Sequence, residues 1–161
     1  MTKNSAEKLL KILYVLLILI FIAFIFSNSL ESSQVSASKS SYVVKKINQT
    51  LENMNSPFLL KEVFVRKSAH FIEFFILGSL VFGFMCMNGW VKSRYIIFPC
   101  FFCCLIAMTD ETLQYFSKRG SMLLDVWLDL AASVTAILLL YFIYNRYKKR
   151  IKDRGSILET T

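Results

Sequence analysis

The sequence has a single histidine, His70, and lacks the short motifs that identify several classes of hydrolase. There is no G-x-S-x-G nucleophile motif, and one histidine is too few for an H-E-x-x-H zinc motif. These absences give no support to a serine hydrolase or a metalloprotease. If an imidazole acts in acid–base chemistry in this chain, it has to be that of His70.

The chain also lacks the cysteine pattern of a disulfide-stapled secreted domain. Its four cysteines all lie inside apolar runs, where they are expected to pack as small hydrophobic side chains. Cys100 and Cys103 form a C-x-x-C, but no second ligand pair accompanies it. A zinc or redox motif is therefore weakly supported.

The regular alternation of polar and apolar residues typical of a soluble domain is missing. Hydrophobic residues make up 55% of the chain and are gathered in blocks. We predict an all-α, polytopic membrane protein: a single domain, residues 1–161, with a four-transmembrane-helix bundle. The expected spans are about 12–27, 69–87, 95–109 and 123–144. Ser27-Asn28-Ser29 resembles a signal-peptide cleavage site, but the length of the first run and the later spans favour an uncleaved helix.

The long polar loop, residues 28–65, is expected to contain one short extracytoplasmic amphipathic helix. The serine-rich stretch 27–41 predicts a flexible linker. Apolar residues at helical spacing over 42–54 predict a helix that lies on the membrane surface or packs on the ends of the spans. Ser56-Pro57 predicts the start of the next helix, and Ser121, after Gly120, predicts the cap of the last one.

The distribution of basic residues predicts the orientation of the spans. The net charge is +8, and lysine and arginine are dense in the carboxyl tail, residues 145–161. By the positive-inside rule, both termini should be cytoplasmic. We expect a multi-pass protein of the plasma membrane. No basic stripe remains once the spans are removed, so nucleic acid is not an expected partner.

Two clusters of polar residues interrupt the apolar blocks at the predicted outer face. In the first, Arg66, His70 and Glu73 share one helix face, with Lys67 beside them. The second cluster and the start of the last helix contribute Asp110, Glu111, Gln114, Arg119, Asp125 and Asp129. Because helix ends on one side of a membrane can converge, we expect these residues to meet and form a binding site.

The acidic side chains in these clusters outnumber the basic ones. The cations Arg66, Lys67 and Arg119 face five carboxylates, and adding Lys118 still leaves a deficit. Mutual pairing that only fixes helix register is one interpretation. The others are a protonated carboxyl group, a protonated His70 or a bound cation. A divalent cation would be held through the oxygen atoms of Asp110, Glu111 and Asp125.

These clusters resemble the VanZ-like family of small membrane proteins. The segments that carry the resemblance are R-K-S-A-H-F-I-E-F-F-I-L-G, from Arg66 to Gly78, and D-E-x-x-Q-x-F, from Asp110 to Phe116, followed by Arg119 and Asp125. The resemblance implies a role in the cell envelope, linked to resistance to the glycopeptide teicoplanin. It also implies that the following polar residues occupy positions shared by the family: Arg66, Lys67, His70, Glu73, Asp110, Glu111, Gln114, Arg119 and Asp125. The sequence departs from the family pattern at Asp129, usually Asn, and at Ala132, usually Gly.

Three functions fit these features. The first is a non-enzymatic envelope protein whose outer polar pocket binds a lipid-linked cell-wall intermediate or a lipoglycopeptide, with the cations on phosphate or carboxylate groups. The second is a membrane enzyme acting on a lipid-borne substrate, in which His70 is the general acid or base and Glu73 orients it. A transporter is the third, but four spans are few and no broken-helix repeat is visible.

Overall fold

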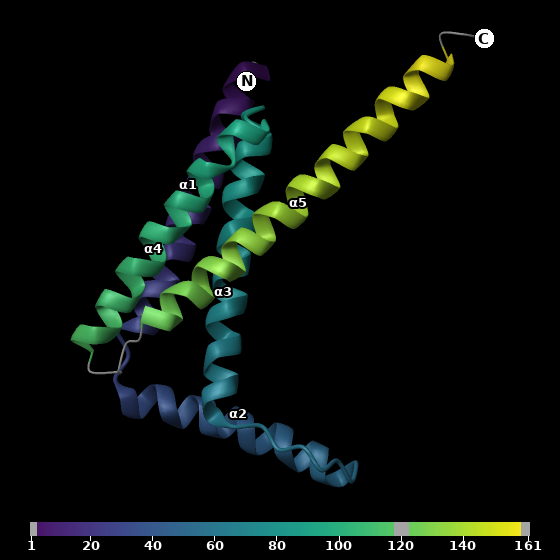
Figure 1. The fold of residues 1–161 in the computed structure, drawn as a ribbon. Coiled ribbons are helices and arrows are strands. Elements are labelled where there is room, and N and C mark those ends of the chain that lie inside the picture. Colours follow the sequence, from purple (N-terminus) through teal and green to yellow (C-terminus); the bar gives the residue numbers. More distant parts are fainter. Residues whose placement is uncertain (1–2, 118–122, 159–161) are drawn as a thin grey trace.

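The structure is a computed structural model that describes residues 3–117 and 123–158 (Figure 1). Within these ranges the chain forms helices and the turns between them, which confirms the predicted all-α class. The elements are α1 (Lys3–Ser29), α2 (Ser33–Asn53), α3 (Glu62–Met87), the short 3₁₀ helix η1 (Ser93–Tyr95), α4 (Ile97–Phe116) and α5 (Leu123–Leu158).

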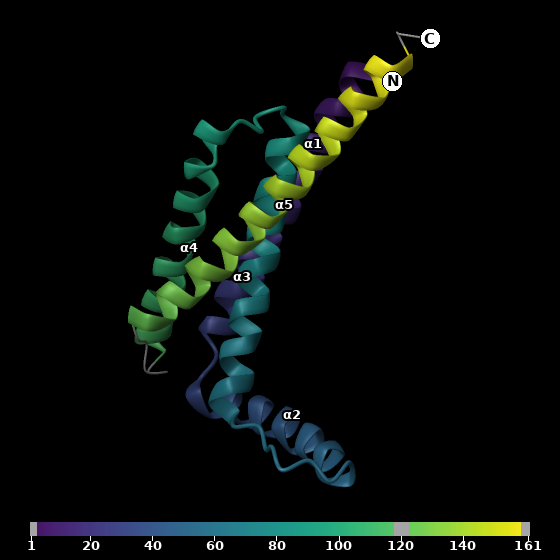
Figure 2. The same ribbon diagram turned by 45° about the vertical axis from the view of Figure 1, so that its right-hand side comes forward.

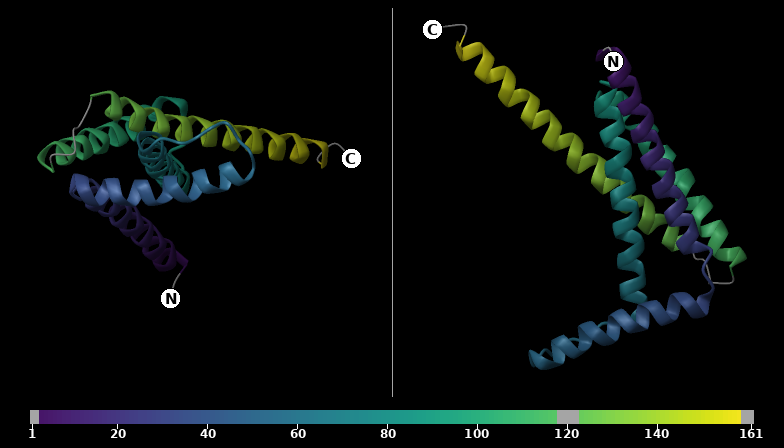
Figure 3. Two further views of the ribbon diagram at one scale, coloured as in Figure 1. Left: turned by 90° about the horizontal axis from the view of Figure 1, so that it is seen from below. Right: turned by 180° about the vertical axis from the view of Figure 1, so that it is seen from behind.

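Four of these helices, α1, α3, α4 and α5, are long and apolar enough to cross a membrane. They form an open bundle, and α2 lies across one end of it (Figure 1). The amino end of α1, the α3–α4 connection and the far part of α5 lie at the opposite end (Figure 2). The carboxyl half of α5 diverges from the other helices (Figure 3). Because the number of spans is even, the start of α1 and the end of α5 lie at the same end of the bundle (Figures 1 and 2).

Helix α3 is the centre of the bundle, because it contacts α1, α2, α4 and α5. Its fully buried residues Phe74 and Leu77 face the core. Gly78 allows the closest approach: a Cβ atom at this position would lie 2.5 Å from the carbonyl oxygen of Ser133 on α5. The absence of a side chain at Gly78 therefore lets the backbones of α3 and α5 touch at their crossing.

The prediction of a flexible linker over residues 27–41 was wrong. Helix α1 continues to Ser29, and α2 begins at Ser33, so residues 30–32 are all that separate them. Ser32 caps α2, since its side chain accepts a hydrogen bond from the Val35 N–H. Ser36 is buried. The serines that suggested a linker thus supply the cap and a small inward-facing residue.

The predicted helix start at Ser56-Pro57 was also wrong. After Asn55, which has a positive φ of 52°, the chain runs back beside α2, and α3 begins only at Glu62. The Asn48 side chain holds this return segment: its Nδ2 donates to the Leu60 carbonyl at 3.1 Å, and its Oδ1 accepts from the Leu60 N–H at 2.8 Å. The Asn48 amide therefore satisfies the backbone N–H and carbonyl of Leu60, and these groups do not take part in a helix. The predicted cap at Ser121 lies outside the described residues.

Candidate functional site

The polar residues gather at the end of the bundle next to α2. Helix α3 contributes His70 and Glu73, and α4 contributes Asp110. The last turn of α1 contributes Asn28 and Ser29, because α1 extends beyond its apolar run. Asn28 with Glu73 and Ser29 with Asp110 form hydrogen bonds between helices, which satisfy these polar groups and fix the helices that carry them.

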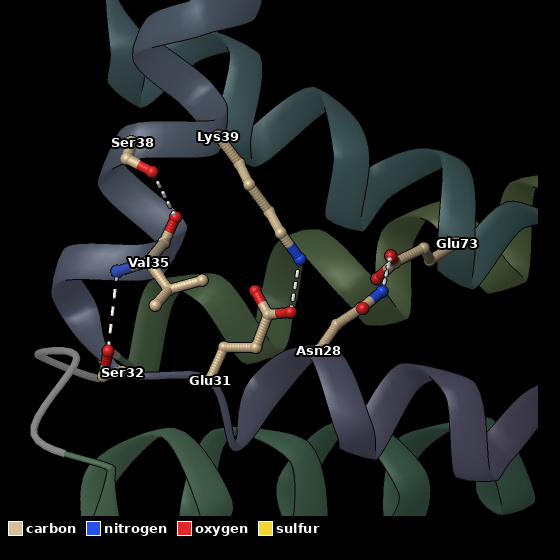
Figure 4. A network of polar contacts seen from close by, with 7 residues as sticks. All are labelled: Asn28, Glu31, Ser32, Val35, Ser38, Lys39 and Glu73. Atoms are coloured by element: carbon tan, nitrogen blue, oxygen red, sulfur yellow. Dashed lines mark hydrogen bonds and ion pairs between the residues drawn. The ribbon is translucent and has the colours of Figure 1, made fainter.

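Glu73 is held from two sides. Asn28 Nδ2 donates to Glu73 Oε1 at 2.7 Å (Figure 4). His70 Nδ1 lies 3.7 Å from Glu73 Oε2 and 3.9 Å from Asp110 Oδ2. The imidazole therefore stands between a carboxylate of its own helix and one of α4.

Asp110 is fully buried and accepts hydrogen bonds on both oxygens. The Ser29 hydroxyl donates to Oδ1 at 2.5 Å, and Gln114 Nε2 donates to Oδ2 at 2.9 Å. Gln114 lies one turn along the same helix, whereas Ser29 comes from α1. These contacts fix the plane of the carboxylate and the packing of α1 against α4.

Asp129 of α5 is buried, with 1% of its surface exposed. Among the described residues, neither carboxylate oxygen of Asp129 has a hydrogen-bond partner. Its backbone carbonyl accepts a hydrogen bond from the Ser133 hydroxyl at 2.8 Å, so this contact involves the main chain of Asp129 and not its carboxylate. Glu111 is also buried and lies near Asp129, since both line a small cavity.

The two basic residues of α3 behave differently. Lys67 Nζ lies 2.6 Å from Asp125 Oδ1, so this pair links α3 to α5 nearer the aqueous end. Arg66 makes no hydrogen bond or ion pair with the described residues, and its side chain lines two cavities. Arg119 lies outside the described residues.

A pocket of about 210 Å³ lies under α2, between the end of α1 and the start of α3. Its charged walls come from Glu31, Lys39, Arg66 and Glu73, and His70 borders it as well. Lys39 forms an ion pair with Glu31, and both residues line the pocket (Figure 4). The pocket thus presents both signs of charge, and its inner wall is the His70–Glu73 pair.

A model described as VanZ/LLP1 matches residues 11–144, which include all four candidate spans' apolar cores and every described residue of the polar site. The chain belongs to the VanZ/LLP1 family. No curated protein and no solved structure matches the chain.

Sequence reasoning about this VanZ/LLP1 chain missed three site residues, Asn28, Ser29 and Lys39. All three lay in the stretch 27–41 that was predicted to be a linker, and the first two also belonged to the sequence that resembles a signal-peptide cleavage site. One signal pointed to Ser29: it continues the inward face of α1 after Ile18, Ile22 and Ile25, which are all buried. A small polar residue on the apolar side of a span is a candidate partner for a buried acid.

The residues grouped for a metal differ from those expected. One ligand atom from each of His70, Asp110 and Asp129 lies within 4.8 Å of the other two, and no other such group occurs among the described residues. Of the expected oxygen ligands, Asp110 belongs to this group. Asp125 is instead paired with Lys67, and Glu111 lies beside the group.

Proposed function

We propose that this VanZ/LLP1 membrane protein binds the polar head of an amphiphile at the pocket under α2, with a lipid-linked cell-wall intermediate or a lipoglycopeptide as the ligand. Such binding in the cell envelope would link the protein to glycopeptide resistance of the teicoplanin type. The observation that carries the proposal is a pocket with charges of both signs at the polar end of a membrane bundle.

The charges of the pocket suit this class of ligand. Arg66 is a guanidinium without an ion partner among the described residues, and a guanidinium binds phosphate or carboxylate through two parallel hydrogen bonds. Glu31, just after α1, and Glu73, two turns from Arg66 on α3, also line the pocket and suit an amine or hydroxyl groups. Wall intermediates and lipoglycopeptides combine anionic and hydrogen-bonding groups with a lipid chain, so both features of the pocket would be used.

Helix α2 suits a position at the membrane interface. One face of it packs on α3, and large apolar side chains are exposed on it and on the return segment that follows, namely Tyr42, Val43, Ile47, Met54, Phe58 and Leu59. An amphipathic helix of this kind lies at the level of the lipid headgroups. The pocket beneath it would then open where the head of an amphiphile is found.

The test is the lipid that stays bound during purification. Wild-type protein, Arg66→Gln and Arg146→Gln are extracted in mild detergent and compared by native mass spectrometry. Arg146 is the matched control, because its guanidinium lies over the Phe142 ring, 4.5 Å from the ring centroid, in the diverging half of α5. A lost charged hydrogen bond of about 1.5–3 kcal/mol predicts a fall in occupancy of about tenfold or more for Arg66→Gln only. Equal lipid content in all three would contradict the proposal.

One observation favours a second candidate, a membrane enzyme acting on a lipid-borne substrate. His70 Nδ1 lies 3.7 Å from Glu73 Oε2 beside the pocket, which is beyond hydrogen-bond length but close enough for the pair to tighten into a general acid or base and its orienting carboxylate when a substrate binds. Incubation of purified protein with a lipid-linked wall intermediate distinguishes the two functions. An enzyme converts the lipid over repeated turnovers, whereas a binding protein returns it unchanged.

A further inference from the structure

We propose that His70, Asp110 and Asp129 bind one divalent transition-metal ion at the centre of the polar end of the bundle. The site goes beyond headgroup binding and does not depend on it. Three different helices, α3, α4 and α5, supply the ligands. A bound ion would therefore hold α3, α4 and α5 together at the polar end of the bundle.

The geometry is close to that of a coordination shell. The three ligand atoms lie within 4.8 Å of one another. In a tetrahedral shell, two ligand atoms that each lie about 2.1 Å from the ion are about 3.4 Å apart. Small side-chain movements would thus complete the shell, without any shift of the helices.

Asp129 is the second and independent reason for a cation. Its carboxylate is buried, and neither oxygen has a hydrogen-bond partner among the described residues. A desolvated carboxylate without a partner is costly, so a native structure is expected to supply a proton or a cation. Lys67, which borders the same small cavity as Asp129, already lies 2.6 Å from Asp125, one helical turn before Asp129.

Asp110 carries the supporting contacts that metal ligands usually have. The hydroxyl of Ser29 and the amide of Gln114 each donate to one of its oxygens. A carboxylate oxygen has two lone pairs and can accept a hydrogen bond while binding a metal. Such outer contacts fix the direction of a ligand before the ion arrives.

The ligand set indicates the class of ion. One imidazole nitrogen with two carboxylates suits Mn²⁺, Fe²⁺ or Zn²⁺, whereas Mg²⁺ and Ca²⁺ prefer oxygen ligands throughout. A cavity of about 10 Å³ borders His70 and Asp129, with Glu111 and Gln114 on its walls. That is about the room for one water molecule, which could serve as a further ligand.

The experiment measures metal binding alone. Purified protein in detergent is stripped with a chelator, returned to chelator-free buffer and titrated with Mn²⁺, and free Mn²⁺ is followed by its electron paramagnetic resonance signal. The variants are Asp129→Asn, His70→Gln and, as control, Asp153→Asn. The control makes the same substitution on the same helix, 24 residues away from Asp129, at an exposed position.

We expect one Mn²⁺ per chain for wild type and for Asp153→Asn, with Zn²⁺ displacing it. Asp129→Asn and His70→Gln should each weaken binding by about tenfold or more. In a parallel thermal melt, Mn²⁺ should raise the midpoint of wild type and of the control and leave that of Asp129→Asn unchanged. Wild type that binds no more Mn²⁺ or Zn²⁺ than Asp129→Asn would overturn the proposal and leave a protonated Asp129. His70→Gln gives the same test through a second ligand.

Discussion

At the scale of single residues, the polar end of the bundle is built from side chains that partner one another between helices. Asn28 with Glu73 and Ser29 with Asp110 join α1 to α3 and α4. Asp129 departs from this arrangement, since no described residue bonds its carboxylate. The resemblance found in the sequence leads us to expect Asn at this position, so we treat the acid as a departure from the expected pattern.

The pair His70 and Glu73 gives a prediction at this scale. If the two act as one unit in the pocket, His70→Gln, Glu73→Gln and the double change should reduce function about equally, because the effects of coupled residues do not add. The measurement is the protection of cells against a lipoglycopeptide, with membrane expression checked for every variant. Additive losses would mean that His70 and Glu73 have separate roles. Full protection by His70→Gln would mean that this helix face serves only in packing.

At the scale of elements, the spans and their polar clusters could be predicted from the sequence, because long apolar blocks and charged residues are local signals. The extent of α2 and the late start of α3 could not. Both depend on tertiary contacts: Ser36 is buried, and Asn48 hydrogen-bonds the backbone of Leu60, twelve residues away. Serine-rich sequence has weak helix propensity, and packing overrides such preferences.

The same limit applies to the candidate site. The spacing of His70 and Glu73 predicted that the two side chains share a helix face, since that depends on one helix alone. It could not predict that Asp129, rather than Asp125, has its ligand atom beside those of His70 and Asp110. That choice depends on how α5 crosses α3, which is set by the backbone contact at Gly78 and Ser133.

This crossing gives a prediction about elements. Gly78→Ala places a methyl group 2.5 Å from a backbone oxygen of α5, so the helices have to separate. We expect a loss of about 1–3 kcal/mol in stability, seen as a lower midpoint of thermal unfolding in detergent. Gly83→Ala is the control on the same helix, because its Cβ would meet only the movable end of the Tyr14 side chain. An equal fall for both variants would argue against a special role for the α3–α5 crossing.

At the scale of the whole molecule, the bundle has one polar end under α2 and one end that carries the chain's termini. We predict that the polar end faces outward, because the basic tail favours the cytoplasm. A cysteine at exposed Ser41 should react with a membrane-impermeant thiol reagent on intact cells, and one at Lys152 only after the membrane is opened. The native cysteines, all in spanning helices, provide the background signal. Labelling of Lys152→Cys from outside would reverse the orientation.

The hydrogen bonds from Asn28 and Ser29 also have a consequence for how the protein is made. An acid such as Asp110 is costly to place alone in lipid, and its hydroxyl partner is on a helix synthesised about eighty residues earlier. Helix α1, the most apolar of the four, can partition into the bilayer by itself. The later helices insert at a lower free-energy cost when α1 is already in the bilayer, because it supplies hydrogen-bond partners for their acidic side chains. Insertion of these helices is therefore coupled to their assembly with α1.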